Sequence, residues 1–220
     1  MVAFHPGLNE LPAEIGIFPL HGALLLPQGR LPLNIFEPRY LNLVQEALGQ
    51  GRMLGMIQPN PALTDGELFR VGCLGRLASF AETDDGRFLI TLNGVIRFRV
   101  ATELPLRQLH RQVRVDYHGY EADLDLADRP GLADRAGLLA ALRDYFRLRG
   151  IEANWAGIEQ TPDAALLTTL CIVCPFEARE KQALLEAATP DERARLLLAL
   201  LQMATQAGAH PEPAPGSKPS

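Results

Sequence analysis

The sequence contains only two lysines, Lys181 and Lys218, so nearly all of its basic charge is arginine. With a formal net charge of −5, the chain lacks the broad basic face that general nucleic-acid binding requires. No apolar run approaches the roughly 20 residues of a membrane span, and the N-terminal residues lack the basic and apolar regions of a signal peptide. We therefore expect a cytoplasmic protein that has no membrane segment, and nucleic-acid binding is disfavoured.

Cysteine is also scarce, and its three positions, Cys73, Cys171 and Cys174, do not form the dense even set of a small disulfide-rich domain. Cys171 and Cys174 have the spacing of a redox or metal pair, but no second cysteine pair or nearby histidine pair completes a zinc site. Their spacing of three residues at the end of a predicted helix places them on one face and favours a place in the core. We expect reduced thiols, with no metal and no cofactor.

Catalytic sets of residues are missing as well. The chain has no Gly-x-x-x-x-Gly-Lys-Ser/Thr loop to hold nucleotide phosphates. Ser79 is the only serine in the region expected to fold, and Lys181 is the only lysine there. We place Ser79 in the middle of a strand and Lys181 on a helix surface near Glu177, so neither residue is expected to act as a nucleophile or base. The sequence predicts no catalytic residue.

A short helix is the clearest local prediction, over residues 38–50. Pro38 suits the first helical position, and Glu37 lies at the positive end of the helix dipole. Apolar residues then recur with helical spacing, at Tyr40, Leu41, Val44, Ala47 and Leu48. Upstream, residues 16–20 and 24–27 are apolar runs cut by prolines, which indicate edge strands or strand ends.

Five further strands are predicted from apolar and alternating patterns, over residues 52–59, 70–81, 87–92, 95–100 and 109–117. A turn at residues 84–86 and another at Asn93-Gly94 would connect three of them into an antiparallel meander. Asn-Gly is the dipeptide most favoured in a two-residue type I′ turn.

Beyond residue 134 the apolar period changes from two to about 3.6 residues, which predicts helices to the end of the folded region. Gly150 and the capping box Thr189-Pro190-Asp191-Glu192 mark helix ends. The predicted parts are a β domain (1–120), a solvated acidic connector (121–133), a helical domain (134–206) and a disordered proline-rich tail (207–220). This order of elements indicates an α+β fold.

With these patterns in place, the chain resembles the Lon protease N-terminal domain, or LON substrate-binding domain, especially its stand-alone bacterial form. The resemblance extends from about Leu11 to Met203 and is most specific in the segment Ile35-Phe36-Glu37-Pro38-Arg39-Tyr40. It implies a PUA-like β pseudo-barrel, mainly antiparallel, followed by a helical bundle. We assign a structural role to the signature residues, which are Phe36, Glu37, Pro38, Arg39, Tyr40, Gly94 and Arg97.

The resemblance also implies a function, because in Lon this domain captures unfolded or degron-bearing polypeptide and later domains carry the ATPase and peptidase activities. We therefore expect a non-catalytic polypeptide-binding module in protein quality control, or a protease adaptor, with such polypeptides and possibly a protease as partners. Client contact is expected at an apolar approach formed by Phe18, Leu24, Leu25 and Ile35. The alternative interpretation is that these four residues belong to the core.

The alternative function is binding of RNA or a nucleotide derivative by the PUA-like β domain, through the arginines Arg97, Arg99, Arg111 and Arg114. These arginines could instead pair with the carboxylates of Glu37, Glu103 and Asp116. In particular, we predict an ion pair between Glu37 and Arg97, since charges embedded in apolar segments persist only when they are paired.

Overall fold

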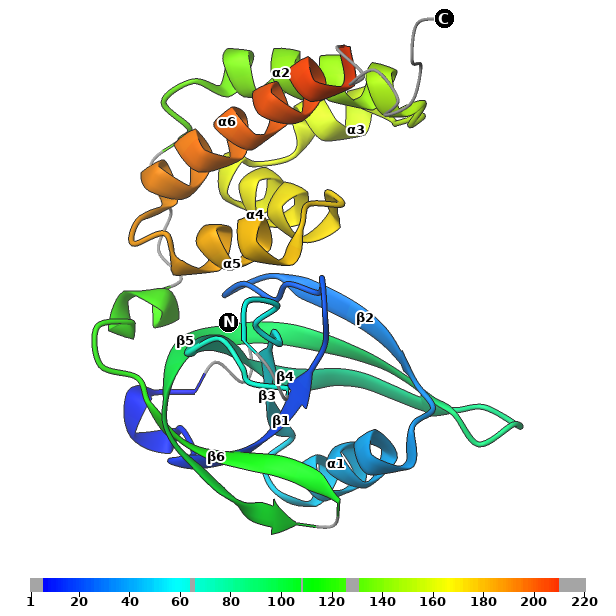
Figure 1. Ribbon diagram of the computed structural model, residues 1–220, viewed down its shortest axis with the longest axis vertical. Helices are drawn as coiled ribbons and strands as arrows, with labels where there is room; N and C mark the ends of the chain where they lie inside the picture. Colours follow the sequence, from blue (N-terminus) through cyan, green and yellow to red (C-terminus); the bar gives the residue numbers. More distant parts are fainter. Residues whose placement is uncertain (1–5, 64–65, 108, 126–130, 210–220) are drawn as a thin grey trace, which may run out of the picture.

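A β-sheet of six strands precedes a group of helices in the computed structural model, which describes residues 6–63, 66–107, 109–125 and 131–209 (Figure 1). The strands are β1 (Glu14–Pro19), β2 (Arg30–Ile35), β3 (Met53–Ile57), β4 (Val71–Glu82), β5 (Phe88–Arg107) and β6 (His110–Asp116). The α-helices are α1 (Pro38–Gly49), α2 (Arg135–Arg149), α3 (Trp155–Gln160), α4 (Asp163–Val173), α5 (Ala178–Glu186) and α6 (Pro190–Ala209), with short 3-10 helices η1 (Leu8–Glu10) and η2 (Glu121–Leu124). The predicted α+β fold is confirmed. None of the helices in these ranges is long and apolar enough to cross a membrane.

The sheet closes on itself into a pseudo-barrel. Strand β5 pairs with β4, and the order continues through β3, β1 and β6 until β6 pairs with β5 again. Among the described strands only β1 and β3 run parallel, so the predicted mainly antiparallel barrel is confirmed. Strand β2 lies outside this ring and pairs only with the first part of β5, which leaves it as an edge strand.

The two segments predicted upstream of α1 differ in outcome. Residues 16–19 form the end of β1, as one of the two predicted alternatives stated, and β1 is not an edge strand because it lies between β3 and β6. Residues 24–27 form a buried loop instead of a strand. The edge strand of this region is β2, and it accommodates Pro32 because an edge strand does not need every N–H for its ladder.

The type I′ turn predicted at Asn93-Gly94 is wrong, because β5 runs through both residues without a break. Gly94 is instead a point of close backbone approach. Its N–H donates to the carbonyl of Gly29 at 2.8 Å, and its carbonyl accepts from the N–H of Gln28 at 2.9 Å. A Cβ atom at Gly94 would lie 1.9 Å from the carbonyl oxygen of Leu26, so only glycine fits here.

Helix α1 forms as predicted. Glu37 is its N-cap residue and Pro38 occupies the first turn. The buried side chains Tyr40, Leu43, Val44 and Ala47 face the sheet. The Tyr40 hydroxyl donates to the carbonyl of Pro19 at 3.2 Å, so the helix start is tied to the end of β1.

The C-terminal helices follow the predicted stop and start signals closely. Gly150 ends α2 in the left-handed conformation, at φ 63°. Helix α4 begins at Asp163, directly after Pro162, and α6 continues through Ala209. Residues 210–220 of the predicted tail lie outside the described residues.

Lys181 is buried, and the predicted surface pair with Glu177 is wrong. Its ammonium group donates to the carbonyl of Ile172 at 3.1 Å, in the last turn of α4. The final carbonyls of a helix lack partners within the helix, so a cation placed there satisfies one of them. Burial lowers the pKa of Lys181, and the nearby Cys174 opposes this shift.

A buried polar network joins the barrel to the helices and replaces the predicted Glu37–Arg97 ion pair. Arg97 of β5 forms a two-pronged salt bridge with Asp123 of η2, with N–O distances of 2.8 and 2.9 Å. The same guanidinium donates to the carbonyls of Leu185 and Ala187, just beyond the barrel. Glu37 pairs with its neighbour Arg39 instead.

The acidic connector is therefore not uniformly solvated, because Asp123 is only 5% exposed. A second polar contact crosses the same junction, where Gln182 of α5 donates to the carbonyl of Val71 in β4 at 3.0 Å. Gln58 donates to the side chain of Gln182 and to the carbonyl of Ala178. One hydrophobic core also extends from the sheet and α1 into the helices, so the two parts are packed together.

All three cysteines are free and buried, which confirms the predicted place of Cys171 and Cys174 in the core. Burial raises the pKa of all three thiols, to about 12 for Cys171 and about 11 for Cys174. A thiol whose folded pKa is raised stabilises the fold below its unfolded pKa of about 9, and this stabilisation is lost as the pH rises.

We expect this effect to be visible for Cys174 between pH 9 and 10.5. Over that interval the free energy of unfolding of the wild type should fall by about 1.5 kcal/mol more than that of Cys174→Ala. Urea denaturation under reducing conditions at both pH values measures the difference. Parallel losses in the two proteins would show that the native thiol titrates normally.

Candidate polypeptide-binding surface

The four residues predicted to contact a client, Phe18, Leu24, Leu25 and Ile35, all lie in the hydrophobic core with almost no exposed surface. Their side chains pack beneath the sheet and α1, as the alternative interpretation stated. These four side chains are packed against other core side chains, so a client would reach them only if the fold rearranged. A polypeptide-binding surface must therefore be sought among other residues.

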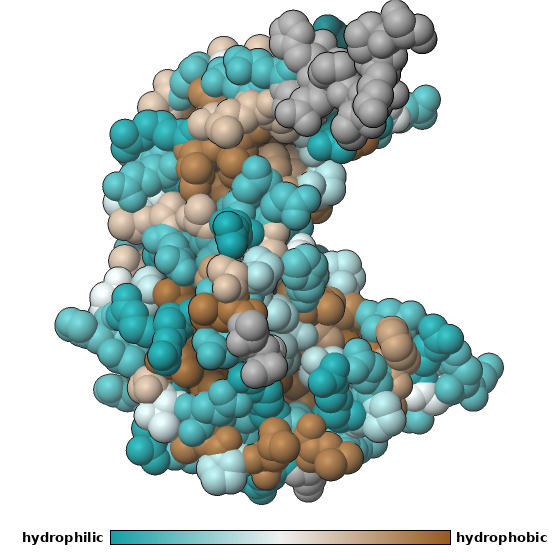
Figure 2. All heavy atoms as spheres, in the orientation of Figure 1, coloured by the Kyte–Doolittle hydropathy of each residue, from teal (hydrophilic) through white to brown (hydrophobic). Residues whose placement is uncertain are grey.

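One part of the sheet extends beyond the barrel, and we call it the arm; it consists of β2, residues 77–82 of β4 and residues 88–92 of β5. In Figure 1 the arm projects from the barrel and ends in the hairpin that links β4 to β5. Its strands are held in register, with Leu33 opposite Ile90 and Ile90 opposite Phe80. Figure 2 shows a concave outline between the arm and the helices.

Three large apolar side chains of the arm and its margin are exposed to solvent. The exposed fractions are 62% for Phe36, 45% for Leu89 and 40% for Phe80. Phe80 retains an edge contact with the buried Phe88, with ring centroids 4.9 Å apart. In Figure 2 the tip of the arm is hydrophilic, and apolar residues lie nearer its base.

A shallow depression of about 510 Å³ lies on the arm, and it crosses all three strands. It is lined by Pro32, Leu33, Asn34, Ser79, Phe80, Ala81, Leu89, Ile90 and Thr91. Most of these side chains are small or apolar and none is charged, so the depression suits apolar side chains of an extended chain.

Both edges of the arm are open to another strand within the part of the chain that the structure describes. Strand β2 pairs with β5 only, and β3 pairs with β4 only as far as Arg76. Residues 78–82 therefore lack a neighbouring strand on their outer side. An unpaired edge offers backbone N–H and C=O groups to an extended polypeptide.

The hairpin at the tip of the arm is fixed by local polar contacts. The Thr83 hydroxyl donates to the Asp85 carboxylate, and Arg87 forms a salt bridge with Asp85 at 2.7 Å. The Thr83 hydrogen bond, with help from Arg87, holds the pKa of the Asp85 carboxyl below its usual range. Gly86 supplies the left-handed conformation of the turn, at φ 78°.

The signature residues near α1 divide between the core and the surface. Tyr40 is buried, and the Arg39 guanidinium lies 4.5 Å from the centre of its ring. Phe36 instead points out of the core beside the arm, where the Arg87 guanidinium lies 5.8 Å from its ring. The structural role predicted for Phe36 therefore has no support from packing.

The four arginines considered for RNA binding make contacts within the protein. Arg97 is buried on Asp123, and Arg111 pairs with Glu103 at 2.6 Å, which is one of the carboxylate partners expected for these arginines. Arg114 pairs with Glu14, at 2.8 Å. Arg99 lies 5.7 Å from the centre of the Tyr120 ring. These contacts do not support the RNA-binding alternative.

Phe80 and Leu89 were not predicted as site residues, although both fall in predicted strands. The sequence does contain a signal for exposure of Phe80, because its neighbours in Ala78-Ser79-Phe80-Ala81 are small or polar. Which strand positions remain exposed depends on where the helices pack. That placement is a long-range property that strand periodicity does not contain.

Comparisons with known proteins agree with this architecture. The family model described as the ATP-dependent protease La (LON) substrate-binding domain matches residues 14–203. Lon protease 2 of Sorangium cellulosum is 30% identical over 201 residues, which cover 86% of this chain and 24% of that protein. Lon protease 2 of Thermus thermophilus is 24% identical, over 87% of this chain and 24% of that protein. The chain thus spans about a quarter of the length of these relatives.

Two solved structures have the same fold. The Lon N-terminal domain protein from Xanthomonas campestris matches with a TM-score of 0.59 and 24% identity, covering 84% of this chain and 97% of that one. The N-terminal domain of the Mycobacterium avium complex Lon protease matches with a TM-score of 0.57 and 14% identity, covering 86% and 98%. Together with the family match over residues 14–203, these findings show that the chain belongs to the LON substrate-binding domain family.

Proposed function

We propose that this chain is a non-catalytic module that captures unfolded or degron-bearing polypeptide on its arm, in protein quality control or as an adaptor for a protease. The observation that carries the proposal is an open-edged part of the sheet with exposed apolar side chains, in a family described as substrate-binding. An extended client adds to the edge of the arm through its backbone.

The two open edges of the arm differ in what they offer a client. Strand β2 carries Pro32, which has no N–H to donate and which limits strand pairing at that edge. The outer edge of residues 78–82 contains no proline and includes the exposed Phe80. We therefore place the added strand beside residues 78–82, with alternate apolar side chains of the client against Phe80.

The positions of the two residues considered for a Ser–Lys pair support a non-catalytic role. Ser79 is exposed on the arm, whereas Lys181 is buried beneath the end of α4 with its ammonium group on the carbonyl of Ile172. A serine nucleophile needs an adjacent base within hydrogen-bond reach, and these two residues belong to different parts of the fold.

Replacement of Phe80 by aspartate is expected to weaken capture of an unfolded client by about tenfold or more, because the apolar contact of a phenylalanine is worth roughly 1.5–3 kcal/mol. Leu89→Asp tests whether the depression on the same arm binds the client, and it leaves the contact between Phe80 and Phe88 in place. The matched control is Leu63→Asp, which adds the same charge at an exposed leucine in a loop away from the strands. Binding is measured by fluorescence anisotropy with a reduced, carboxymethylated protein as the client.

Two results would contradict this proposal. Equal binding of the carboxymethylated client and its native folded form would exclude selective capture of unfolded polypeptide. Unchanged binding by both arm variants, beside normal capture by Leu63→Asp, would exclude the arm as the binding surface.

A further inference from the structure

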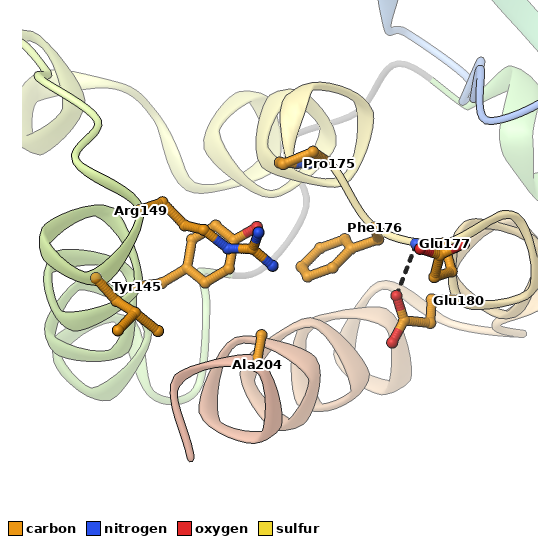
Figure 3. A pocket seen from close by; sticks show the side chains of 8 residues that line it. Tyr145, Arg149, Pro175, Phe176, Glu177, Glu180 and Ala204 are labelled. Carbon is orange, nitrogen blue, oxygen red and sulfur yellow. Dashed lines mark hydrogen bonds between the residues drawn. The ribbon is translucent and has the colours of Figure 1, made fainter. Parts of the chain in front are cut away.

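A second cavity, of about 500 Å³, lies among the helices and away from the arm. Helices α2 and α6 and the segment between α4 and α5 enclose it (Figure 3). It is lined by Tyr145, Leu148, Arg149, Pro175, Phe176, Glu177, Glu180 and Ala204. Its volume falls within the range of cavities that bind small ligands.

The Tyr145 side chain is an unusual polar group in this cavity. The residue is fully buried, and its hydroxyl oxygen forms no hydrogen bond of normal geometry with the described residues, although the Arg149 guanidinium lies beside it. Buried polar atoms normally have a partner, so an unsatisfied one marks a place where a ligand could supply it. Burial raises the pKa of this hydroxyl, and the adjacent Arg149 opposes the shift.

Arg149 provides a cation beside that hydroxyl. Its guanidinium lies 5.5 Å from the centre of the Tyr145 ring, and Figure 3 shows its nitrogens next to the Tyr145 oxygen. The two groups offer N–H and O–H donors to a single acceptor. A carboxylate is suited to this pair, since bonds from a guanidinium to an ionised oxygen are about twice as strong as neutral ones.

The other residues that line the cavity indicate which further chemical groups a ligand needs. Phe176 lies with its ring centroid 6.1 Å from that of Tyr145, and Pro175 and Leu148 extend the apolar wall. Glu177 and Glu180 line the other side, and one Glu180 oxygen accepts from the Glu177 N–H at 2.7 Å. These two carboxylates disfavour a bare anion such as phosphate and favour a ligand that also has an N–H donor.

We propose that this cavity binds the C-terminal residue of a polypeptide. The free α-carboxylate accepts from Tyr145 and Arg149, an apolar side chain lies against Phe176, and the backbone N–H faces Glu180. This inference rests on the proposed function, because it names a second contact for the same class of client. A chain end is the part of a polypeptide that combines a carboxylate, an N–H group and an apolar side chain within one residue.

The test compares two N-terminally labelled peptides that end in leucine and differ only in a free or an amidated C-terminus. We expect the free acid to bind at least tenfold more tightly to the wild type. Tyr145→Phe and Arg149→Gln should each remove most of this preference. The matched control is Arg147→Gln, which removes an exposed arginine two residues earlier on α2 and should retain it.

Tyr145→Phe also has a distinct stability signature. Because its hydroxyl is unsatisfied in the free protein, removal should leave the melting temperature unchanged or raise it. A loss of acid preference in a protein of undiminished stability is evidence for a ligand-binding hydroxyl. A clear drop in the melting temperature would show that the hydroxyl stabilises the fold and would overturn its assignment as a ligand donor.

The outcomes separate this inference from the proposed function. Equal affinity for acid and amide, with normal capture of the carboxymethylated client, would overturn the C-terminal site alone. Phe80→Asp should retain the acid preference while it loses capture on the arm. If the wild type neither captures the carboxymethylated client nor prefers the free-acid peptide, the proposed function and this inference are both overturned.

Discussion

Replacing Asp123 by alanine is expected to lower the free energy of unfolding by about 3–5 kcal/mol, because it leaves the buried guanidinium of Arg97 without its carboxylate. The two side chains are each only 6% exposed, and the carboxylate accepts from both the side chain and the backbone N–H of Arg97. Urea denaturation at neutral pH measures the loss. The large effect follows from the unpaired charge, which water cannot reach without opening the junction between barrel and helices.

Two control variants separate the effect of the unpaired Arg97 charge from that of simply removing a carboxylate. Asp84→Ala, at the exposed hairpin of the arm, removes an equivalent charge and should change stability by less than about 0.5 kcal/mol. The double variant Asp123→Leu with Arg97→Met removes both charges and should lose less than Asp123→Ala alone. A loss below about 1 kcal/mol for Asp123→Ala would mean that Arg97 finds other partners or solvent.

This pair also shows where inference from the sequence ends. The need for a buried partner of Arg97 was predictable, because a charge within the apolar run of β5 must be compensated. The identity of that partner was not, since Asp123 lies 26 residues away in a segment rich in acidic residues. The acidic composition favoured a solvated connector, and only the docking of η2 against β5 distinguishes Asp123 from its neighbours.

Local features were predicted more reliably because their causes lie within a few residues. Pro38 and Gly150 set helix ends through their own backbone preferences, and the structure has both helices at these positions. The surface of the arm has no such local cause. Phe18 and Phe80 both lie in strands, yet Phe18 is buried against Tyr40 of α1, whereas Phe80 is 40% exposed.

The cavity among the helices was beyond sequence analysis for the same reason. Tyr145 and Phe176 lie 31 positions apart in the sequence, and their approach depends on how α2 packs on the segment between α4 and α5. A buried tyrosine without a hydrogen-bond partner is visible only when every surrounding atom has been placed.

Replacing Gly94 by alanine is expected to lower the free energy of unfolding by about 3 kcal/mol or more. The added Cβ would lie 1.9 Å from the Leu26 carbonyl oxygen and 2.7 Å from the carbonyl carbon, which are backbone atoms that cannot rotate away. Relief of this clash must separate the loop at residues 26–29 from β5, with loss of the hydrogen bonds to Gln28 and Gly29. Guanidinium denaturation with circular dichroism measures the change.

Gly49→Ala provides the control, because the same methyl group is added where no atom lies within 4 Å. Gly49 is the last residue of α1, so alanine there should leave stability unchanged or raise it by up to about 1 kcal/mol. A turn at Asn93-Gly94 would have required glycine for its backbone conformation, whereas the structure requires it for lack of space. Tolerance of serine or alanine at Gly94 without loss of stability would refute the close approach of the loop.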